Sequence, residues 1–247
     1  MSAPLFFADA GALASASAGE PLLLGGAEGR HAATVRRMGV GERVDVADGE
    51  GALARCVVVS VARDELTLQV LGVTTGAVPA PRFVLVQALA KGGRDDLAVE
   101  AATELGVDEI VPWQAARSVV QWRGERGEKA RQGWAATARA AAKQSRRPRV
   151  PLVAPLQGGS GVRDRIARAT LAVVLHEEAV APLAAVTLPA AGDVLLVVGP
   201  EGGICAEELA AFTEAGAAAY RLGPHVLRAS TAGPAAIAVL SAAARWR

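Results

Sequence analysis

The chain has 247 residues, enough for one large domain or two small ones, and it is 51% hydrophobic but only 4% aromatic, so we expect a core of Ala, Val and Leu. Its formal net charge of +1 points to no particular partner, so only the distribution of charge along the chain is informative. The two Cys lack CxxC or His-rich neighbours, and no stretch reaches the roughly 18 to 20 apolar residues of a membrane helix, so we expect a cytoplasmic protein without disulfides or a metal site.

Residues 1–73 are predicted to form a small β-rich domain. Short apolar runs and one cleanly alternating run are separated by regular turns, a pattern typical of a small barrel. The dipeptide Asp48-Gly49 is a strong turn signal between two of these runs. The predicted strands are 5–8, 21–24, a hairpin over 43–59, and 65–71, with a short helix over 31–38.

A linker is predicted over residues 74–81, because this stretch is rich in Pro and small residues. The second domain, residues 82–247, then begins with a buried strand over 83–89. Asp95 and Asp96 are predicted to cap the helix that follows. Leu97, Ala101 and Leu105 are expected to lie on one side of this helix.

Basic residues are concentrated between positions 117 and 149, where ten Lys and Arg stand against two acids. On a continuous helix some of them share one face, and like charges at that spacing repel unless an anion neutralises them. A charge run is usually a solvated face, but the scarcity of acids here favours binding of a polyanion. The face consists of Arg139, Lys143, Arg146 and Arg147. Three nearby tryptophans are expected to be core or interface anchors: Trp113, Trp122 and Trp134.

Three apolar runs near the C-terminus each lead into a polar loop. The run at 194–198 is typical of a strand buried on both faces, and Gly202-Gly203 permit a sharp turn and close approach of a ligand. Because the carboxyl ends of parallel strands meet at one edge of a sheet, we expect the three loops to form one pocket. The loops are 175–178, 199–204 and 222–231.

Glu201 indicates which ligand suits this pocket. A phosphate cradle requires a following Lys and Ser or Thr, or a GxGxxG pattern with a ribose-binding acid, and a carboxylate would repel phosphate. A cofactor with a positive centre, such as the sulfonium and ammonium groups of S-adenosylmethionine, suits a loop with Glu201 better. An ordinary turn whose glycines serve only packing is the alternative.

Together these motifs resemble the SPOUT class of RNA methyltransferases and, more narrowly, the ribosomal RNA small subunit methyltransferase E family. The resemblance extends over essentially the whole chain. The residues that carry it are GPEGG at 199–203, LHE at 175–177, LGPHVLRASTA at 222–232, ALAKGGR at 88–94, ATELGV at 102–107, RSVV at 117–120 and KQSR at 143–146.

The resemblance implies a homodimer that uses S-adenosylmethionine to methylate N3 of one uridine of 16S rRNA in the small ribosomal subunit, position 1498 in the usual rRNA numbering. It implies an α/β fold in which a PUA-like, RNA-binding β-barrel precedes a SPOUT-type domain with a parallel sheet. It also implies a trefoil knot within about residues 170–247, together with the cofactor site.

The site residues follow from the three loops and the distribution of basic residues, together with the resemblance. The expected cofactor contacts are Leu175, His176, Glu177, Gly199, Pro200, Glu201, Gly202, Gly203, Ile204, Leu222, Gly223, Val226, Leu227, Arg228, Ser230, Thr231 and Ala232. The expected RNA contacts, with a solvated surface as the alternative, are Arg30, Arg36, Arg37, Lys91, Arg94, Arg117, Arg139, Lys143, Arg146 and Arg147. Ser230 and Thr231 are also expected to supply the N-cap of the last helix.

Three residues are candidates for catalysis. Arg228 is expected to hold a substrate phosphate or to stabilise charge on the uracil oxygens as N3 loses its proton. Glu201 and His225 are the candidate bases, and water is the alternative proton acceptor. Many relatives resemble LGxRILRxETA, so His225 and Ser230 depart from that pattern. The alternative functions are methylation of another RNA or of a ribose 2′-OH, and RNA binding without catalysis in ribosome assembly.

Overall fold

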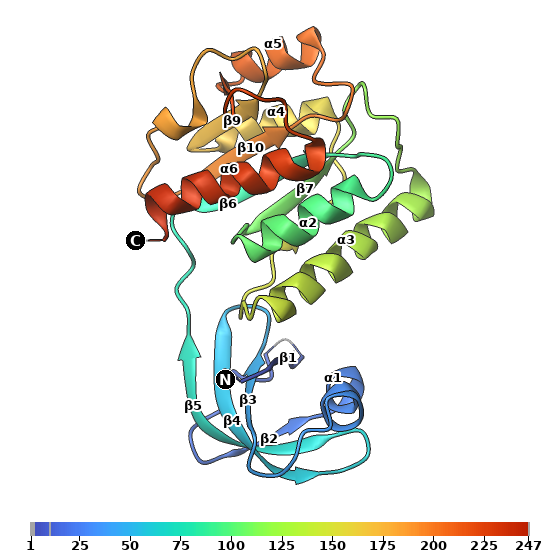
Figure 1. Ribbon diagram of the computed structural model, residues 1–247, viewed down its shortest axis with the longest axis vertical. Helices are drawn as coiled ribbons and strands as arrows, with labels where there is room; N and C mark the ends of the chain where they lie inside the picture. The colour runs from blue at the N-terminus through green and yellow to red at the C-terminus, as the bar shows by residue number, and fades with distance from the viewer. Residues whose placement is uncertain (1–2, 10, 247) are drawn as a thin grey trace. The chain divides into compact units, whose positions relative to one another are not determined.

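A computed structural model describes residues 3–9 and 11–246 of the chain. Contacts between residues divide it into two units. The first contains the residues up to Val78 together with 142–150, and the second contains 79–141 together with 151 onward. Figure 1 shows the elements of both. In the part of the chain that is described, no helix has both the length and the apolar character needed to cross a bilayer.

The first unit is built on a five-stranded sheet in the order β1-β3-β4-β5-β2. β1 runs parallel to β3, whereas the other neighbouring strands are antiparallel. The hairpin predicted at Asp48-Gly49 is confirmed, because the Asp48 carboxylate accepts bonds from the N–H groups of residues 50–52 and closes the turn. The strands are β1 (Leu5–Phe7), β2 (Pro21–Leu24), β3 (Arg43–Ala47), β4 (Ala52–Val61) and β5 (Leu66–Thr75), with helices α1 (Gly26–Arg30) and η1 (His31–Val35).

The segment 142–150 belongs to the first unit, which differs from the predicted division at 74–81. Val150 N–H donates to Gly49 O over 2.9 Å, and Lys143 Nζ lies 2.5 Å from Glu28 Oε2. Lys143 Nζ also lies 4.5 Å from the centre of the Phe6 ring. Main-chain and charged contacts therefore place this short segment against the β-rich unit.

The second unit is built on a six-stranded, entirely parallel sheet in the order β11-β9-β10-β6-β7-β8. Its central strands are apolar on both faces, as the sequence predicted for the run at 194–198. The strands are β6 (Arg82–Ala88), β7 (Glu109–Trp113), β8 (Leu152–Val153), β9 (Leu171–Leu175), β10 (Asp193–Val198) and β11 (Ala218–Tyr220). The helices are α2 (Arg94–Glu104), α3 (Gly124–Gln144), α4 (Gly159–Arg168), η2 (Leu183–Ala185), α5 (Ala206–Glu214) and α6 (Ala229–Ala244).

Helices cover both faces of this sheet (Figure 1). Leu85 and its same-face neighbours pack with α2, α3 and α6, whereas Val84 and Val86 pack with α4 and α5. A Cβ atom on Gly233 of α6 would lie 2.9 Å from Leu85 Cδ1, so the missing side chain lets this helix approach β6 closely. The sheet and α6 therefore form a dense layer beneath the loops at the carboxyl ends of the strands.

Two helix predictions were wrong in detail. α2 begins one residue before Asp95, with Gly93 at the N-cap, so Asp95 and Asp96 lie in its first turn. Its buried apolar residues are Ala98, Val99 and Ala102, and Leu97 is 57% exposed. α3 ends at Gln144 and Arg146 has φ of +59°, so Arg146 and Arg147 do not continue the helical face of Arg139 and Lys143.

The three tryptophans lie in or against the core, as predicted. Trp113 is fully buried in β7, and its ring makes an edge contact with Phe212 of α5 at 5.4 Å between centroids. Trp122 and Trp134 make a second edge contact at 5.0 Å. These rings therefore serve packing within the second unit.

Candidate active site

A cavity of about 330 Å³ lies at the carboxyl edge of the parallel sheet. It is bounded by the loops that follow β9, β10 and β11 and by the first turn of α6, so the predicted meeting of three loops is present. A smaller cavity of about 110 Å³ shares part of this wall and extends along the loop after β11. The residues common to both are Leu175, His176, Glu177, Val226, Leu227 and Ala232.

The loop after β10 owes its tight course to glycines. Gly203 has φ of +72°, a left-handed conformation that favours glycine, and its N–H donates to Pro200 O over 2.9 Å. A Cβ atom on Gly199 would lie 2.7 Å from Ile204 Cγ1. Ile204 is 7% exposed and lines the cavity, so the loop folds back onto its own apolar side chain.

The start of α5 closes this loop. Cys205 is the N-cap, and it forms a reciprocal capping box with Glu208. Glu207 and Glu208 lie in the first turn, where the helix dipole favours negative charge. The Glu207 N–H and the Cys205 side chain hold the pKa of the Glu207 carboxyl below its ordinary value. The first turn of α5 is therefore acidic, with Cys205 as its cap.

The loop after β11 leads directly into α6. Gly223 has φ of +77°, and Arg228 is the N-cap residue, with extended backbone. The prediction that Ser230 and Thr231 cap α6 was wrong, because both lie inside its first turn. The Arg228 carbonyl accepts bonds from Thr231 N–H at 2.8 Å and Ala232 N–H at 2.9 Å, so the backbone turn begins at Arg228.

Glu201 is bound to the loop that follows β6. Its Oε1 accepts a bond from Lys91 N–H at 3.2 Å and from Arg94 Nη1 at 3.1 Å. Partial burial by itself raises the pKa of the Glu201 carboxyl, but the N–H groups of Glu201 and Lys91 and the Arg94 guanidinium outweigh it. The net pKa lies below its ordinary value, so Glu201 is ionised at neutral pH.

Most of the predicted cofactor residues surround the two cavities. Glu201 and Arg228 line the larger cavity, and His225 lines the smaller one. The predicted residues that border neither are Gly202, Ser230 and Thr231. Residues that border a cavity without having been predicted to contact the cofactor are Arg94, Val198, Arg221, Pro224 and Ala229. Pro224 and Ala229 lie within the predicted loop 222–231, and extending the predicted loops by one residue would have found Val198 and Arg221. Arg94 comes from a distant segment and required the tertiary structure.

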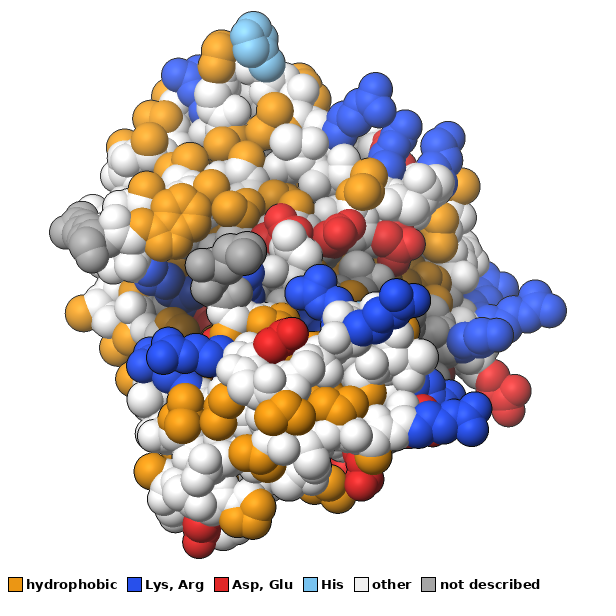
Figure 2. Space-filling model, turned by 60° about the horizontal axis from the view of Figure 1, so that its bottom comes forward, with side chains coloured by type: hydrophobic (Ala, Val, Ile, Leu, Met, Phe, Trp, Pro, Cys, Tyr) orange, Lys and Arg blue, Asp and Glu red, His pale blue; other side chains and the backbone are white. Residues whose placement is uncertain are grey.

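The residues predicted to contact RNA are divided between the two units. On the face in Figure 2, Asp and Glu side chains as well as apolar and neutral surface lie between the Lys and Arg side chains. In the first unit, Arg30 pairs with Asp64 at 3.2 Å, whereas Arg36 borders a groove of about 960 Å³. This groove also carries Arg43 and Arg55.

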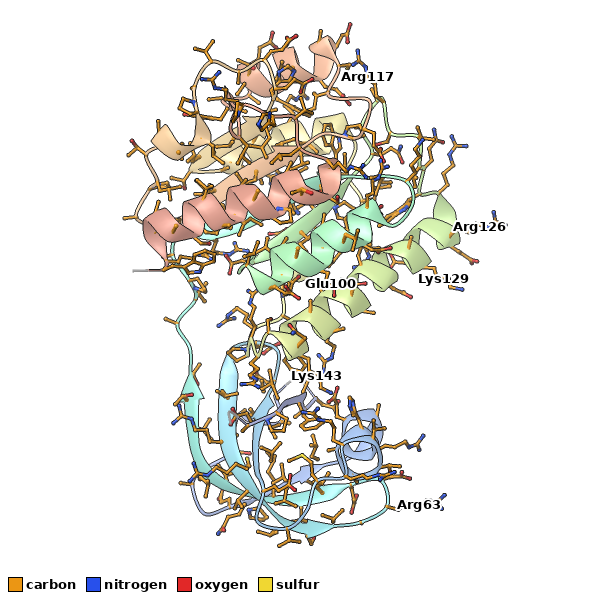
Figure 3. All side chains as sticks on the ribbon, viewed as in Figure 1. Arg63, Glu100, Arg117, Arg126, Lys129 and Lys143 are labelled. Atoms are coloured by element: carbon orange, nitrogen blue, oxygen red, sulfur yellow. The ribbon has the colours of Figure 1, made fainter. Side chains whose placement is uncertain are left out.

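Several of the RNA contacts predicted on α3 and just after it already have partners within the protein. Lys143 is already bound to Glu28, and Arg139 and Arg147 also have interaction partners. Figure 3 shows that Arg126 and Lys129 instead extend outward from this helix. Of the other predicted contacts, Lys91 and Arg117 lie in loops of the second unit and Arg94 is the first residue of α2. Arg37 and Arg146 lie in the first unit, and both have a left-handed backbone.

Small molecules bind at the carboxyl edge of parallel sheets, where loops from neighbouring strands converge. The second unit therefore has the layout of an α/β enzyme domain with a cofactor cavity. A family model described as an RNA methyltransferase domain matches residues 78–241, and one described as an RNA methyltransferase PUA domain matches residues 24–71. The expected α/β fold with a preceding PUA-like unit is thus confirmed.

Proteins that share one name align with almost the whole chain. The ribosomal RNA small subunit methyltransferase E of Mycobacterium bovis is 45% identical over 236 residues, covering 92% of this chain and 89% of that protein. The Bacillus subtilis protein of that name is 31% identical over 224 residues, covering 87% and 88%. A crystal structure of the Neisseria gonorrhoeae protein bound to S-adenosyl methionine is 25% identical, with a TM-score of 0.85 and 98% coverage of each chain. The chain belongs to the ribosomal RNA small subunit methyltransferase E family.

Proposed function

We propose that this protein transfers a methyl group from S-adenosylmethionine to 16S rRNA of the small ribosomal subunit, at N3 of the uridine at position 1498 in the usual rRNA numbering. The observation that carries the proposal is the cavity that both Glu201 and Arg228 line. The family relationship and the ligand named for the Neisseria gonorrhoeae structure support the choice of cofactor.

The cavity suits this cofactor in size and chemistry. Its volume of about 330 Å³ is within the range of about 300 to 1,000 Å³ typical of small-molecule sites. Leu175, Ile204 and Leu227 provide apolar surface for an aromatic base, and the loop backbone provides hydrogen-bonding groups. The carboxylates of Glu177 and Glu201 suit a cofactor with cationic groups.

When bound, the cofactor supplies a methyl group made electrophilic by the sulfonium. The protein has to exclude water, to align the uracil nitrogen and to favour loss of the N3 proton. We propose that Arg228 stabilises the negative charge that the uracil oxygens gain as this proton leaves. Arg94 borders the same cavity and adds a second positive charge there.

Glu201 suits an anchoring role better than that of a base. It is ionised, and its carboxylate already accepts bonds from Lys91 and Arg94. A carboxylate with a lowered pKa is a weaker proton acceptor. We therefore propose that His225 or water takes the proton, with His225 reaching the site from the smaller cavity.

We further propose that the protein acts as a homodimer in the cytoplasm, where small subunits are assembled. Exposed apolar side chains at the end of α6 support the dimer, because a second subunit could cover them. Ala242 and Ala243 are exposed, and Trp246 beyond the helix is 55% exposed. We also propose that the chain forms the expected SPOUT-type trefoil knot within about residues 170–247. The PUA-like unit and the loops with Lys91, Arg94 and Arg117 are proposed to contact the rRNA.

Transfer of a labelled methyl group to isolated small subunits and to naked 16S rRNA tests the function. We expect label in rRNA only when S-adenosylmethionine and the protein are both present, and N3-methyluridine after nucleoside digestion and mass spectrometry. A 2′-O-methylated nucleoside would contradict the proposed position. Absence of transfer together with absence of cofactor binding in calorimetry would contradict the enzyme itself and favour a non-catalytic RNA-binding protein.

A further inference from the structure

Three neighbouring loops at the carboxyl edge of the sheet are bonded to one another. They follow β10, β6 and β7, which are adjacent in the sheet. Glu201 joins the first loop to the second, and Ser118 Oγ donates to Leu89 O over 3.1 Å, joining the third to the second. The loop with Arg117, which follows β7, is therefore connected to the loop that forms the cofactor cavity.

Glu208 makes a direct connection between the loop after β7 and the start of α5, which follows the β10 loop. Its Oε1 accepts a bond from Ala116 N–H at 2.7 Å, while its Oε2 faces Cys205 N–H at 3.4 Å. The two oxygens of one carboxylate thus bind the backbone of both loops. Glu208 lies outside the cavity wall, so it has no direct contact with a ligand there.

Arg117 lies against the turn of the cofactor loop. Its Nη1 donates to Gly202 O over 3.0 Å. A Cβ atom on Gly202 would lie 3.2 Å from Arg117 Cβ, so the glycine permits this close approach. A guanidinium has five N–H donors, so the bond to Gly202 leaves capacity for a phosphate oxygen. Arg117 is exposed and stands beside α5 in Figure 3.

We propose that Glu208 is a positioning residue for RNA binding. By fixing the backbone at Ala116, it holds Arg117 against Gly202, so that the guanidinium is already in place for an RNA phosphate at the rim of the cofactor loop. An unrestrained Arg side chain loses more conformational freedom on binding, so prior positioning raises RNA affinity. This inference rests on the proposed function, because it requires that the protein binds rRNA.

The test compares RNA binding by matched variants of the full chain. The probe is the isolated small subunit or naked 16S rRNA, whichever the wild type binds, with dissociation constants measured over a range of salt concentrations. Glu208→Ala removes the bond from Ala116 N–H together with the longer one from Cys205 N–H, and it is expected to weaken RNA binding about fivefold. Glu208→Gln retains an oxygen acceptor and should stay close to wild type. Glu214→Ala, an exposed acid at the other end of α5, is the control.

A double-mutant cycle separates positioning from a general effect on the fold. If Glu208 acts through Arg117, Glu208→Ala should have little further effect in an Arg117→Ala background. In each of the two single variants, the plot of log affinity against log salt concentration should be less steep by about one unit, which corresponds to the loss of one phosphate contact. Cofactor affinity in calorimetry should change less than about twofold in Glu208→Ala, because the capping bond is worth little compared with the cavity contacts.

Additive effects of the two substitutions, or an equal loss of cofactor affinity, would overturn the inference and leave Glu208 as a helix cap. Should Glu208→Ala fail to fold, Glu208→Asp carries the same expectation, because its shorter side chain keeps the charge but does not span the distance to Ala116. Binding of the wild type to the two RNA probes is measured before the variants are compared. Failure to bind either probe would contradict the proposed function rather than the role of Glu208.

Discussion

Arg94 Nη1 donates to Glu201 Oε1 over 3.1 Å, and both side chains border the same cavity. The pair joins the start of α2 to the loop after β10, two segments more than one hundred residues apart in the chain. One consequence is that the negative charge of Glu201 in the cofactor loop is partly balanced by Arg94. The other is that a guanidinium expected only to contact RNA stands at the proposed site of chemistry.

The Arg94–Glu201 pair predicts a pH-dependent contribution to stability. The pKa of Glu201 in the folded protein lies below its ordinary value of 4.5, so the folded state binds this proton less readily than the unfolded chain. The contribution is therefore complete above about pH 4.5 and is lost as the pH falls through the folded-state pKa. Because the pair is partly exposed, Glu201→Gln should lower the free energy of unfolding at pH 7 by at most about 1 kcal/mol.

Urea unfolding of wild type and Glu201→Gln between pH 3.5 and 7 checks this expectation. The difference between the two proteins should shrink toward the acidic end. A difference that stays constant across the whole interval would show that ionisation of Glu201 does not stabilise the fold.

Gly199→Ala should weaken cofactor binding while the protein stays folded. The added Cβ would lie 2.7 Å from Ile204 Cγ1, so Ile204 has to move away from its place in the cavity wall. We expect a loss of affinity for S-adenosylmethionine of about tenfold or more, since overpacking costs about 1 to 3 kcal/mol. Calorimetry measures this, with Gly158→Ala as the control, because a Cβ there has nothing within 4 Å. Unchanged affinity would contradict the packing argument.

Arg228→Ala should abolish turnover and preserve cofactor binding. The side chain begins at the N-cap of α6, whose hydrogen bonds to Thr231 and Ala232 use the Arg228 carbonyl rather than the guanidinium. Removing the guanidinium therefore leaves the helix start intact. Loss of an oxyanion-type donor lowers the rate by about 100-fold or more. Methyl transfer and calorimetry are measured on the same preparation, and an equal loss of both would assign Arg228 to cofactor binding.

Arg245→Ala should strongly destabilise the second unit. Arg245 Nη2 lies 2.5 Å from Asp108 Oδ2, and the two side chains are 12% and 4% exposed. Its Nη1 also donates to Gly106 O over 2.7 Å, and its Cζ lies 3.9 Å from the centre of the Phe83 ring. Removing one partner of a buried pair costs about 3 to 5 kcal/mol. Chemical denaturation measures the loss, and the exposed Arg126→Ala should change stability by less than about 0.5 kcal/mol. Similar values for both would contradict the proposed importance of the pair.

Lys143→Ala should lower the stability of the fold rather than remove a contact with RNA. Lys143 Nζ contacts Glu28 and the face of Phe6, and its side chain is 21% exposed. We expect a loss of about 1 to 2 kcal/mol, measured by denaturation at physiological salt. Glu28→Ala should cause a similar loss, because it removes the same contact. A stable Lys143→Ala protein with weakened RNA binding would restore the original interpretation of this residue as an RNA contact.

The sequence by itself determined the parallel strands near the C-terminus, the three loops that follow them and most residues of the cavity wall. These features are local. The five consecutive apolar residues at 194–198 predict a buried strand, and the glycines at 199, 202 and 203 permit the tight loop after it. The turn at Asp48-Gly49 in the first unit was predicted from local sequence in the same way. The motifs also carried the resemblance to the family.

Only the tertiary structure decided what the charged residues do. Sequence spacing placed Arg139, Lys143 and Arg146 on one helical face, but α3 ends at Gln144 and Lys143 bonds to Glu28. It assigned Arg94 to RNA and left Glu201 as a possible base, whereas the fold brings the two together at the cavity. The physical reason is that the partner of a charge is set by which distant segments the sheet order makes neighbours, and spacing along the chain carries no information about those pairs.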